Sequence, residues 1–306
     1  MNKVIVVAGG TGNLGQRIVT ALRQKGADVR VIVRPSSDVG TVKKLESLGA
    51  SVFTVDTSNI AEVSDVCVGA FCVVSAMAGL RDVIIDTQKV LLDAAIIAGV
   101  PRFIPSDFSL DFTNLTVGDN RNLDLRREFH HYLDKSTISA TTIFIGPFMD
   151  LLTGQMPMIL VKPKWVLYWG NADQRLDFTT MDDTAAFTAN VALDADAPRF
   201  LKVAGDQISA RQMTAVMSEV SGNQFRLLRA GGLGLLNVLI KVARTVAPGT
   251  NDLYPAWQGM QYMRDMMEGR AKVALYDNDR YQGMRWTTVK DMLSTHHKTS
   301  LIATKR

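Results

Sequence analysis

The sequence predicts an α/β fold: a doubly wound parallel sheet with helices on both faces, followed by a smaller α+β region. Three observations support this prediction. Short apolar runs alternate with stretches of helical periodicity through the first half of the chain, as expected of parallel strands joined by crossover helices. The first run, VIVVA, is apolar throughout, as a strand covered on both faces should be. A glycine-rich turn then leads from this run directly into a helical pattern.

The expected elements of the first half follow one another in a regular order. Each expected strand, in some cases with its exit loop, is a short run rich in apolar residues; these runs lie at residues 3–9, 28–34, 51–56, 71–76, 102–108 and 139–148. The expected helices repeat apolar residues at helical spacing and lie at residues 13–26, 40–50, 81–100 and 123–136. Right-handed crossovers between such strands make the sheet doubly wound. We therefore expect residues 1–150 to form one domain.

The regular alternation ends after residue 150. The elements expected there are a strand–turn–strand unit, a helix, a strand with a turn and a second helix, at residues 160–183, 182–194, 199–209 and 210–222. The next segment, 230–272, is rich in glycine, methionine and aromatic residues and is expected to form an irregular, partly helical cap. We expect residues 151–295 to form a smaller region interleaved with the first domain, and residues 296–306 to form a flexible basic tail.

Composition argues against several classes of function. The chain of 306 residues is 47% hydrophobic and carries a net charge of +4 with no long basic run, so no nucleic-acid partner is expected. Its longest apolar stretch after residue 230 is interrupted by Asn237 and Lys241 and is too short to cross a bilayer, so no membrane partner is expected. The two cysteines, Cys67 and Cys72, lie in an apolar stretch without metal-binding spacing. We interpret them as buried thiols of a cytoplasmic protein.

Three glycines after the first strand indicate what the fold binds. Gly9, Gly12 and Gly15 form a GxxGxxG pattern between a strand and a helix. In this position the first glycine permits a tight turn, the second lets a pyrophosphate approach the backbone, and the third lets helix and strand pack closely. The helix N-terminus adds free amides and the positive end of its dipole. The expected dinucleotide contacts are Gly9, Gly10, Thr11, Gly12, Asn13, Leu14 and Gly15.

The end of the second strand predicts which dinucleotide binds. An acidic residue there would bind the ribose 2′-hydroxyl of NAD, but the stretch VIVRPSS places Arg34 at this point. A guanidinium is suited to a 2′-phosphate, and Lys43, early in the next helix, offers a second positive charge. The sequence therefore favours NADP(H) as the cofactor. A solvated surface arginine is the alternative interpretation of Arg34.

Several stretches together resemble the NmrA-like group of atypical short-chain dehydrogenases, which includes the isoflavone reductase-like proteins. The similar stretches are GGTGNLG, VIVRPSS, TQKVLLDAAIIAGVPRFIPSDF, ATTIFIGPF, LDFTTMDDTAAFTANVALD and NDRYQGMRWTTVKDML. The resemblance extends from about Lys3 to about Leu293. It implies a Rossmann domain with a smaller C-terminal substrate domain, and NADPH bound at its adenosine phosphate by Arg34 and Lys43.

The resemblance also implies which residues lie near the rest of the cofactor. The matching positions after the fourth strand and on the long helix are Ser75, Ala76, Met77 and Gln88. The loop PSDF is similar to the family's PSEF, which lines the nicotinamide end of the cofactor. Ser106, Asp107 and Phe108 are therefore expected at that end.

The chain departs from its relatives at the residues that exchange protons. Ordinary short-chain dehydrogenases carry a Tyr-x-x-x-Lys pair, in which the lysine lowers the tyrosine pKa, but here Tyr132 and Lys135 are one residue too close. Isoflavone reductase-like proteins instead carry a lysine early in the helix expected at 123–136. The position that matches this lysine is Arg126, and a family arginine four residues later corresponds to His130.

Three residues are therefore candidates for a catalytic role. Arg126 stays protonated and can stabilise an oxyanion, although it is a poor general base. His130 can titrate in a useful range, and Asp107 in a half-buried cleft can act as an acid. Each has a structural alternative: a solvated helix face for Arg126 and His130, and a turn cap or an ion pair with an arginine for Asp107. Asp182 and Asp183 are interpreted as N-terminal caps of the helix that follows them.

Two functions of different classes remain open. The first is an NADPH-dependent reductase of a small apolar or aromatic substrate, of the aldehyde, enone, quinone or benzylic ether class, in which the cofactor carries the hydride chemistry. The second is an NADP(H)-binding redox sensor of the NmrA type that reports to a protein partner without turnover. The missing lysine favours the sensor, whereas the apolar C-terminal segment favours a ligand pocket and the reductase. A small-molecule substrate and a monomer or homodimer are expected.

Overall fold

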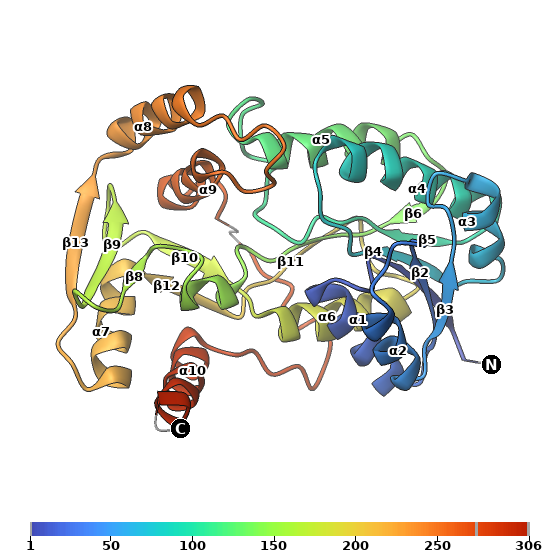
Figure 1. The fold of residues 1–306 in the computed structure, drawn as a ribbon, viewed down its shortest axis with the longest axis horizontal. Coiled ribbons are helices and arrows are strands. Elements are labelled where there is room, and N and C mark those ends of the chain that lie inside the picture. Colours follow the sequence, from blue (N-terminus) through green and yellow to red (C-terminus); the bar gives the residue numbers. More distant parts are fainter. Residues whose placement is uncertain (1, 273–274, 305–306) are drawn as a thin grey trace.

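The computed structural model describes residues 2–272 and 275–304 and contains a six-stranded parallel sheet (Figure 1). The strand order is β3-β2-β1-β4-β5-β6, so the chain starts in the middle of the sheet and winds outward in both directions. The strands are β1 (Val4–Ala8), β2 (Asp28–Val33), β3 (Ser51–Thr54), β4 (Cys72–Ser75), β5 (Arg102–Ile104) and β6 (Ser139–Ala140). The predicted doubly wound fold is confirmed, and its topological switch point lies between β1 and β4.

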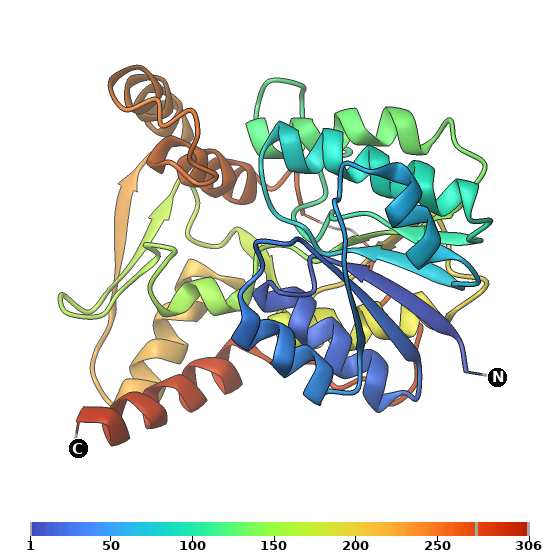
Figure 2. The same ribbon diagram turned by 45° about the vertical axis from the view of Figure 1, so that its right-hand side comes forward.

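Helices cover both faces of this sheet (Figure 1, Figure 2). One face carries α1 (Asn13–Gln24), α2 (Val39–Ser47) and α6 (Met181–Leu193), and the other carries α3 (Ile60–Cys67), α4 (Gln88–Ile97) and α5 (Arg121–Leu133). Residues of β1 alternate between the two cores: Ile5 and Val7 pack with the first group of helices, whereas Val6 and Ala8 pack with the second. Because both faces are covered, the strand must be apolar at every position.

A π-helical segment interrupts the long helix expected at residues 81–100. η1 (Asp82–Thr87) makes a wider turn, and α-helical geometry starts only with α4. Thr87 stabilises the wide turn because its hydroxyl donates to the carbonyl of Asp82 at 2.9 Å. Segments of this kind occur often at functional sites. Here it ends at Gln88, a fully buried residue whose amide nitrogen donates to the carbonyl of Ile84 at 3.1 Å.

The strand expected at residues 139–148 is split in two. β6 extends the large sheet by a short stretch, and β7 (Thr142–Phe144) pairs instead with β11 (Phe200–Lys202). The prediction of one continuous sixth strand is therefore wrong. Its neighbour β5 stops before Pro105, which has no N–H to donate to a longer ladder. Beyond Thr141 the chain consequently pairs with β11.

The second half of the chain forms a smaller lobe with two sheets. β8 (Ile159–Leu160), β9 (Trp165–Trp169) and β13 (Arg226–Gly231) form one in the order β13-β9-β8, and β10 (Arg175–Phe178) and β12 (Asp206–Ser209) form the other. The strand–turn–strand unit expected at 160–183 is present as β9, a turn and β10, although the two strands belong to different sheets. The chain leaves the line of β9 at Gly170, whose φ is +69° and whose N–H donates to the carbonyl of Gly231.

Helices complete this lobe within the described ranges. They are η2 (Met149–Thr153, a 3-10 segment), α7 (Ala210–Ser221), α8 (Leu233–Val246), α9 (Ala256–Glu268) and α10 (Val289–Thr304). The cap expected to be irregular therefore contains two regular helices, α8 and α9. Residues 296–304 of the expected flexible tail continue α10, which packs against α7, and residues 305–306 lie outside the described residues. No helix in the part of the chain that is described has the length and apolar character needed to cross a bilayer.

Segments late in the chain return to the large sheet. α6 packs along α1, and Arg17 of α1 pairs with Asp182 of α6 at 2.7 Å. Tyr281 and Trp286 then pack on Phe187 of α6, with ring centroids 5.3 and 5.7 Å from it. One face of the large sheet is therefore completed by residues that lie far along the sequence.

Both cysteines are free and buried, which confirms the interpretation of them as buried thiols. Burial raises the pKa of the Cys67 thiol to about 11, against the opposing charge of Arg30. Burial likewise raises the pKa of Cys72 to about 12, against the charge of Arg102. Neither thiol is therefore a reactive thiolate at neutral pH.

Candidate functional site

The turn between β1 and α1 is built from glycines because side chains would collide there. A Cβ on Gly15 would lie 2.2 Å from the carbonyl oxygen of Gly9, and a Cβ on Gly10 would lie 2.4 Å from Cγ1 of Val31. Gly9 has a φ of +79°, and a Cβ there would lie 2.6 Å from the backbone of Ala76. The packing of this turn therefore requires all three glycines.

Gly12 differs from its neighbours because the space beside it is open. A Cβ there would meet only the carbonyl oxygen of Gly9, at 3.3 Å. Gly12 is also the N-cap of α1, so no cap side chain bonds to the amides of the first turn. The open space beside Gly12 and the positive end of α1 together fit an anionic group such as a pyrophosphate. Thr11, Asn13 and Leu14 lie in or next to this turn, where the sequence predicted them.

Arg34 and Lys43 lie just beyond the C-terminal end of β2 and on α2, respectively. Both residues are exposed, and within the described ranges neither side chain forms an ion pair or a hydrogen bond. Ser37 fixes the backbone of Arg34, because its hydroxyl accepts from the Arg34 N–H at 3.1 Å and its own N–H donates to the Arg34 carbonyl at 2.9 Å. Two unpaired cations on these elements fit a 2′-phosphate.

Hydrogen bonds join the loops that follow β4 and β5. The hydroxyl of Ser106 donates to the carbonyl of Met77, and the N–H of Ser106 donates to Oε1 of Gln88 at 3.0 Å. The N–H of Ala76 donates to the carbonyl of Ala8 at the end of β1. The structure thus brings together the following predicted residues: Ser75, Ala76, Met77, Gln88 and Ser106. Phe108, which was expected to line the same end, packs into the core of the large sheet.

Arg126 faces this loop from α5. Its Nε donates to the carbonyl of Ser106 at 3.0 Å, and its Nη1 donates to the carbonyl of Asn122 at 2.9 Å. The side chain is half-buried, and among the described residues no carboxylate forms an ion pair with it. A fixed positive charge with no carboxylate in ion-pair contact therefore lies beside Ser106, where it can stabilise negative charge on a ligand.

Asp107 and His130 pair with each other inside the protein. Nε2 of His130 lies 2.6 Å from Oδ2 of Asp107, which is fully buried, and the hydroxyl of Thr142 donates to the same oxygen at 2.9 Å. Burial by itself would raise the pKa of Asp107, but His130, Arg126 and Thr142 outweigh burial and hold this pKa below its usual range. Direct proton donation to a ligand by Asp107 or His130 stays a prediction. The burial of both side chains argues against it.

Tyr262 is a candidate that the sequence did not reveal. It lies half-buried on α9, close to Ser109 and Asn122. Burial raises the pKa of Tyr262 to about 12, although the charge of nearby Arg126 acts in the opposite direction. The hydroxyl therefore keeps its proton at neutral pH and can donate it to a hydrogen bond. The only signal in the sequence was that Tyr262 belongs to the aromatic-rich cap.

The two aspartates expected to cap α6 have other partners. Thr180 is the N-cap, and its hydroxyl accepts from the N–H of Asp183 at 3.0 Å. The Asp183 carboxylate accepts from the N–H of Thr287 at 2.9 Å, and Asp182 pairs with Arg17. The prediction that these aspartates cap the helix is therefore wrong, since a threonine hydroxyl occupies that position.

Comparison with known proteins places the chain in a family. A family model described as the NmrA-like family matches residues 1–283. The chain belongs to this NmrA-like family. A bifunctional pinoresinol-lariciresinol reductase from Linum perenne is 26% identical over 238 residues, which cover 72% of this chain and 76% of that protein. Pinoresinol reductase 2 from Arabidopsis thaliana is 31% identical over 208 residues, which cover 62% of this chain and 64% of that protein.

A solved structure described as AtPrR2 with NADP+ and (+)pinoresinol is also similar to this chain. Its TM-score is 0.81 at 20% sequence identity, and the match covers 96% of this chain and 99% of that one. This likeness shows a shared fold. In this member of the NmrA-like family, the glycine turn, Arg34 and the Ser106 loop all follow the carboxyl ends of parallel strands. Open α/β sheets bind their ligands at this edge.

Proposed function

We propose that this protein is an NADPH-dependent reductase of a small apolar or aromatic molecule. The observation that carries the proposal is the open space beside Gly12, at the N-terminus of α1, together with the two unpaired cations Arg34 and Lys43. These features fit the pyrophosphate and the 2′-phosphate of NADP(H). The curated relatives are named as reductases, and the similar solved structure is described with NADP+ and (+)pinoresinol, which supports the same proposal.

The residues near Ser106 provide the reacting end of the site in this proposal. Hydride transfer is the chemistry that the bound cofactor supplies. Ser106, held by Gln88, lines the nicotinamide end. Arg126 stabilises negative charge that develops on the substrate oxygen, a contribution that in comparable sites is worth about 3–4 kcal/mol. Tyr262 donates a hydrogen bond to the same oxygen, and α9, which carries it, belongs to the region 151–295 that we propose binds the substrate.

The proposal can be tested by following NADPH oxidation with a panel of aryl aldehydes, enones, quinones and benzylic ethers. We expect turnover with at least one class. Arg126→Ala should then lower kcat at least tenfold and leave the affinity for NADPH nearly unchanged, because Arg126 contacts the loop and not the phosphates. Arg126→Lys should retain part of the activity. Full turnover by Arg126→Ala would show that the reacting end does not lie on α5.

A second candidate function is an NADP(H)-binding redox sensor without turnover. The environments of the three candidate catalytic residues favour this function. Arg126 does not exchange a proton, and Asp107 and His130 are buried against each other. Tight NADP(H) binding in calorimetry, with no oxidation of NADPH across the whole panel, would support the sensor over the reductase.

A further inference from the structure

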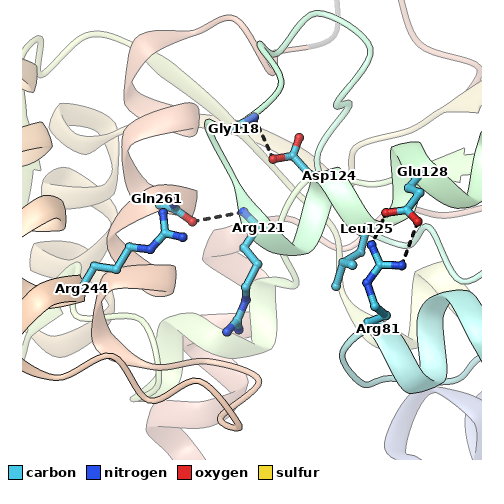
Figure 3. A pocket seen from close by; sticks show the side chains of 8 residues that line it. All are labelled: Arg81, Gly118, Arg121, Asp124, Leu125, Glu128, Arg244 and Gln261. Atoms are coloured by element: carbon cyan, nitrogen blue, oxygen red, sulfur yellow. Dashed lines mark hydrogen bonds and ion pairs between the residues drawn. The ribbon is translucent and has the colours of Figure 1, made fainter.

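A pocket of about 270 Å³ lies between the two lobes, beside α5 (Figure 3). α5 supplies one wall, which includes Arg121 and Leu125, and α8 and α9 supply Arg244 and Gln261. Leu125 is followed directly by Arg126, whose side chain turns toward the Ser106 loop. The same helix therefore separates this pocket from the glycine turn and loops described above.

The acidic groups that line this pocket are already neutralised. Arg81 forms a two-pronged ion pair with Glu128, and Figure 3 shows the two side chains together at one side of the pocket. The carboxylate of Asp124 accepts from Arg127 at 2.7 Å and from the N–H of Gly118 at 2.9 Å. These acids therefore contribute little free negative charge to the pocket.

Two other arginines at the pocket have no carboxylate partner among the described residues. Arg121 donates to the carbonyls of Asp252 and Leu253, both at 2.9 Å, and these are neutral acceptors. Arg244 forms no hydrogen bond or ion pair within the described ranges. The guanidinium groups of Arg121 and Arg244 both lie over the ring of Trp257, at 4.8 and 5.2 Å from its centroid, respectively. The distance between the two guanidinium groups is therefore at most the sum of these two distances.

The position of these arginines carries an electrostatic cost that an anion would remove. Burial lowers the pKa of Arg121, and the charge of Arg244 lowers it further, because the two cations repel each other; Tyr262 and Asp252 act in the opposite direction but do not outweigh these effects. Gln261 adds a neutral donor: its Oε1 accepts from the N–H of Arg121 at 3.3 Å, which leaves its amide nitrogen to donate. Figure 3 shows the side chain of Arg244 extended toward Gln261.

We propose that this pocket binds the carboxylate of a small aromatic acid. Arg244 and Gln261 donate to the carboxylate, Arg121 supplies the second positive charge, and Leu125 offers apolar contact to the ring. The volume is below the usual range for drug-sized ligands, about 300–1,000 Å³, and suits a molecule with a single ring. The binding of this acid does not depend on the proposed reductase function.

The binding can be measured with benzoate as the probe and benzamide as its uncharged control, by calorimetry on the full chain with and without NADP+. We expect benzoate to bind at least tenfold more tightly than benzamide. Arg244→Gln should remove at least this tenfold preference, and because Arg244 is exposed, the variant should fold normally. Arg229→Gln is the matched control, since Arg229 is an exposed arginine on β13 away from the pocket, and it should change nothing.

Equal affinity for benzoate and benzamide, or an unchanged preference in Arg244→Gln, would overturn the proposal. Its failure can be distinguished from failure of the reductase proposal. A protein that oxidises NADPH with neutral aldehydes but ignores benzoate refutes only the carboxylate site. A protein that binds benzoate through Arg244 but does not bind NADPH refutes only the reductase.

Discussion

The buried pair of Asp107 and His130 predicts a large effect on stability for His130→Ala. The carboxylate of Asp107 is fully buried, its Oδ2 lies 2.6 Å from Nε2 of His130, and its Oδ1 has no hydrogen-bond partner among the described residues. Without the imidazole, only Thr142 would remain as a donor. Removal of one partner from a buried hydrogen-bonded pair that contains a carboxylate costs about 3–5 kcal/mol. For a chain of 306 residues, we expect the melting temperature to fall by roughly 5–8 °C.

His131→Ala is the matched control for this prediction. The two histidines are neighbours on α5, but His131 is exposed, so its replacement should change the free energy of unfolding by about 0.5 kcal/mol or less. Both variants can be compared with the wild type by scanning calorimetry and by urea denaturation. The expected result is a clear loss for His130→Ala and almost none for His131→Ala.

The loss of stability in His130→Ala should also depend on pH. The folded-state pKa of Asp107 lies below its usual value, so the pair stabilises the protein above the unfolded pKa of about 3.9, and this contribution is lost as the pH falls through the folded pKa. In His130→Ala the buried carboxyl lacks its counterion and takes up a proton more readily. The stability difference between wild type and variant should therefore narrow as the pH is lowered from 7 toward 4.

One combination of results would refute this reasoning. If His130→Ala melts like His131→Ala while the pH profile of NADPH oxidation changes, then His130 exchanges protons with the substrate. The interpretation of the pair as structural would then be wrong.

Three further predictions concern the cofactor and the reacting end. Arg34→Asp should weaken NADPH binding by more than tenfold, about 1.4 kcal/mol, and change NADH binding much less; equal losses in calorimetry would contradict a contact with the 2′-phosphate. Gly12→Val should fold normally but lose NADPH binding, because its side chain fills the open space beside the turn. Gly15→Ala should instead lose about 1–3 kcal/mol of stability, because its Cβ would lie 2.2 Å from a backbone oxygen. Thermal melts and NADPH titrations separate these two outcomes, and similar behaviour of both variants would contradict the distinction. Tyr262→Phe should lower kcat and leave NADPH affinity intact, and an unchanged kcat would exclude Tyr262 from the chemistry.

The parts of the fold that the sequence predicted correctly depend on local signals. The apolar run of β1, the glycine turn and the periodicity of α1 all lie within about 20 consecutive residues, so the pattern alone specifies them. The requirement for Gly9 and Gly15 was predictable for the same reason. The positions of Arg34 and Ser106 after their strands followed from the strand assignments.

The parts that the sequence did not reveal depend on contacts between distant segments. The consecutive strands β9 and β10 were predicted, but their assignment to different sheets was not, because their partners β13 and β12 come later in the chain. Asp107 and His130 were candidates for proton donors. The sequence does not show that their side chains contact each other in the folded protein. Tyr262 reaches Asn122 from another lobe, and its neighbours on α9 are of similar composition. Tertiary packing, not propensity, decides each of these cases.

Because α6, Tyr281 and Trp286 pack against the large sheet, the stability of each lobe depends on the other. A protease cut or a frameshift soon after residue 150 would remove the cap, and it would also uncover α1 and leave β7 without its partner β11. The nucleotide-binding half is therefore not a portable module. A chimera that exchanges it between relatives must carry residues 181–202 along with 1–150, and a mutation that unfolds the small lobe should shorten the cellular lifetime of the whole protein.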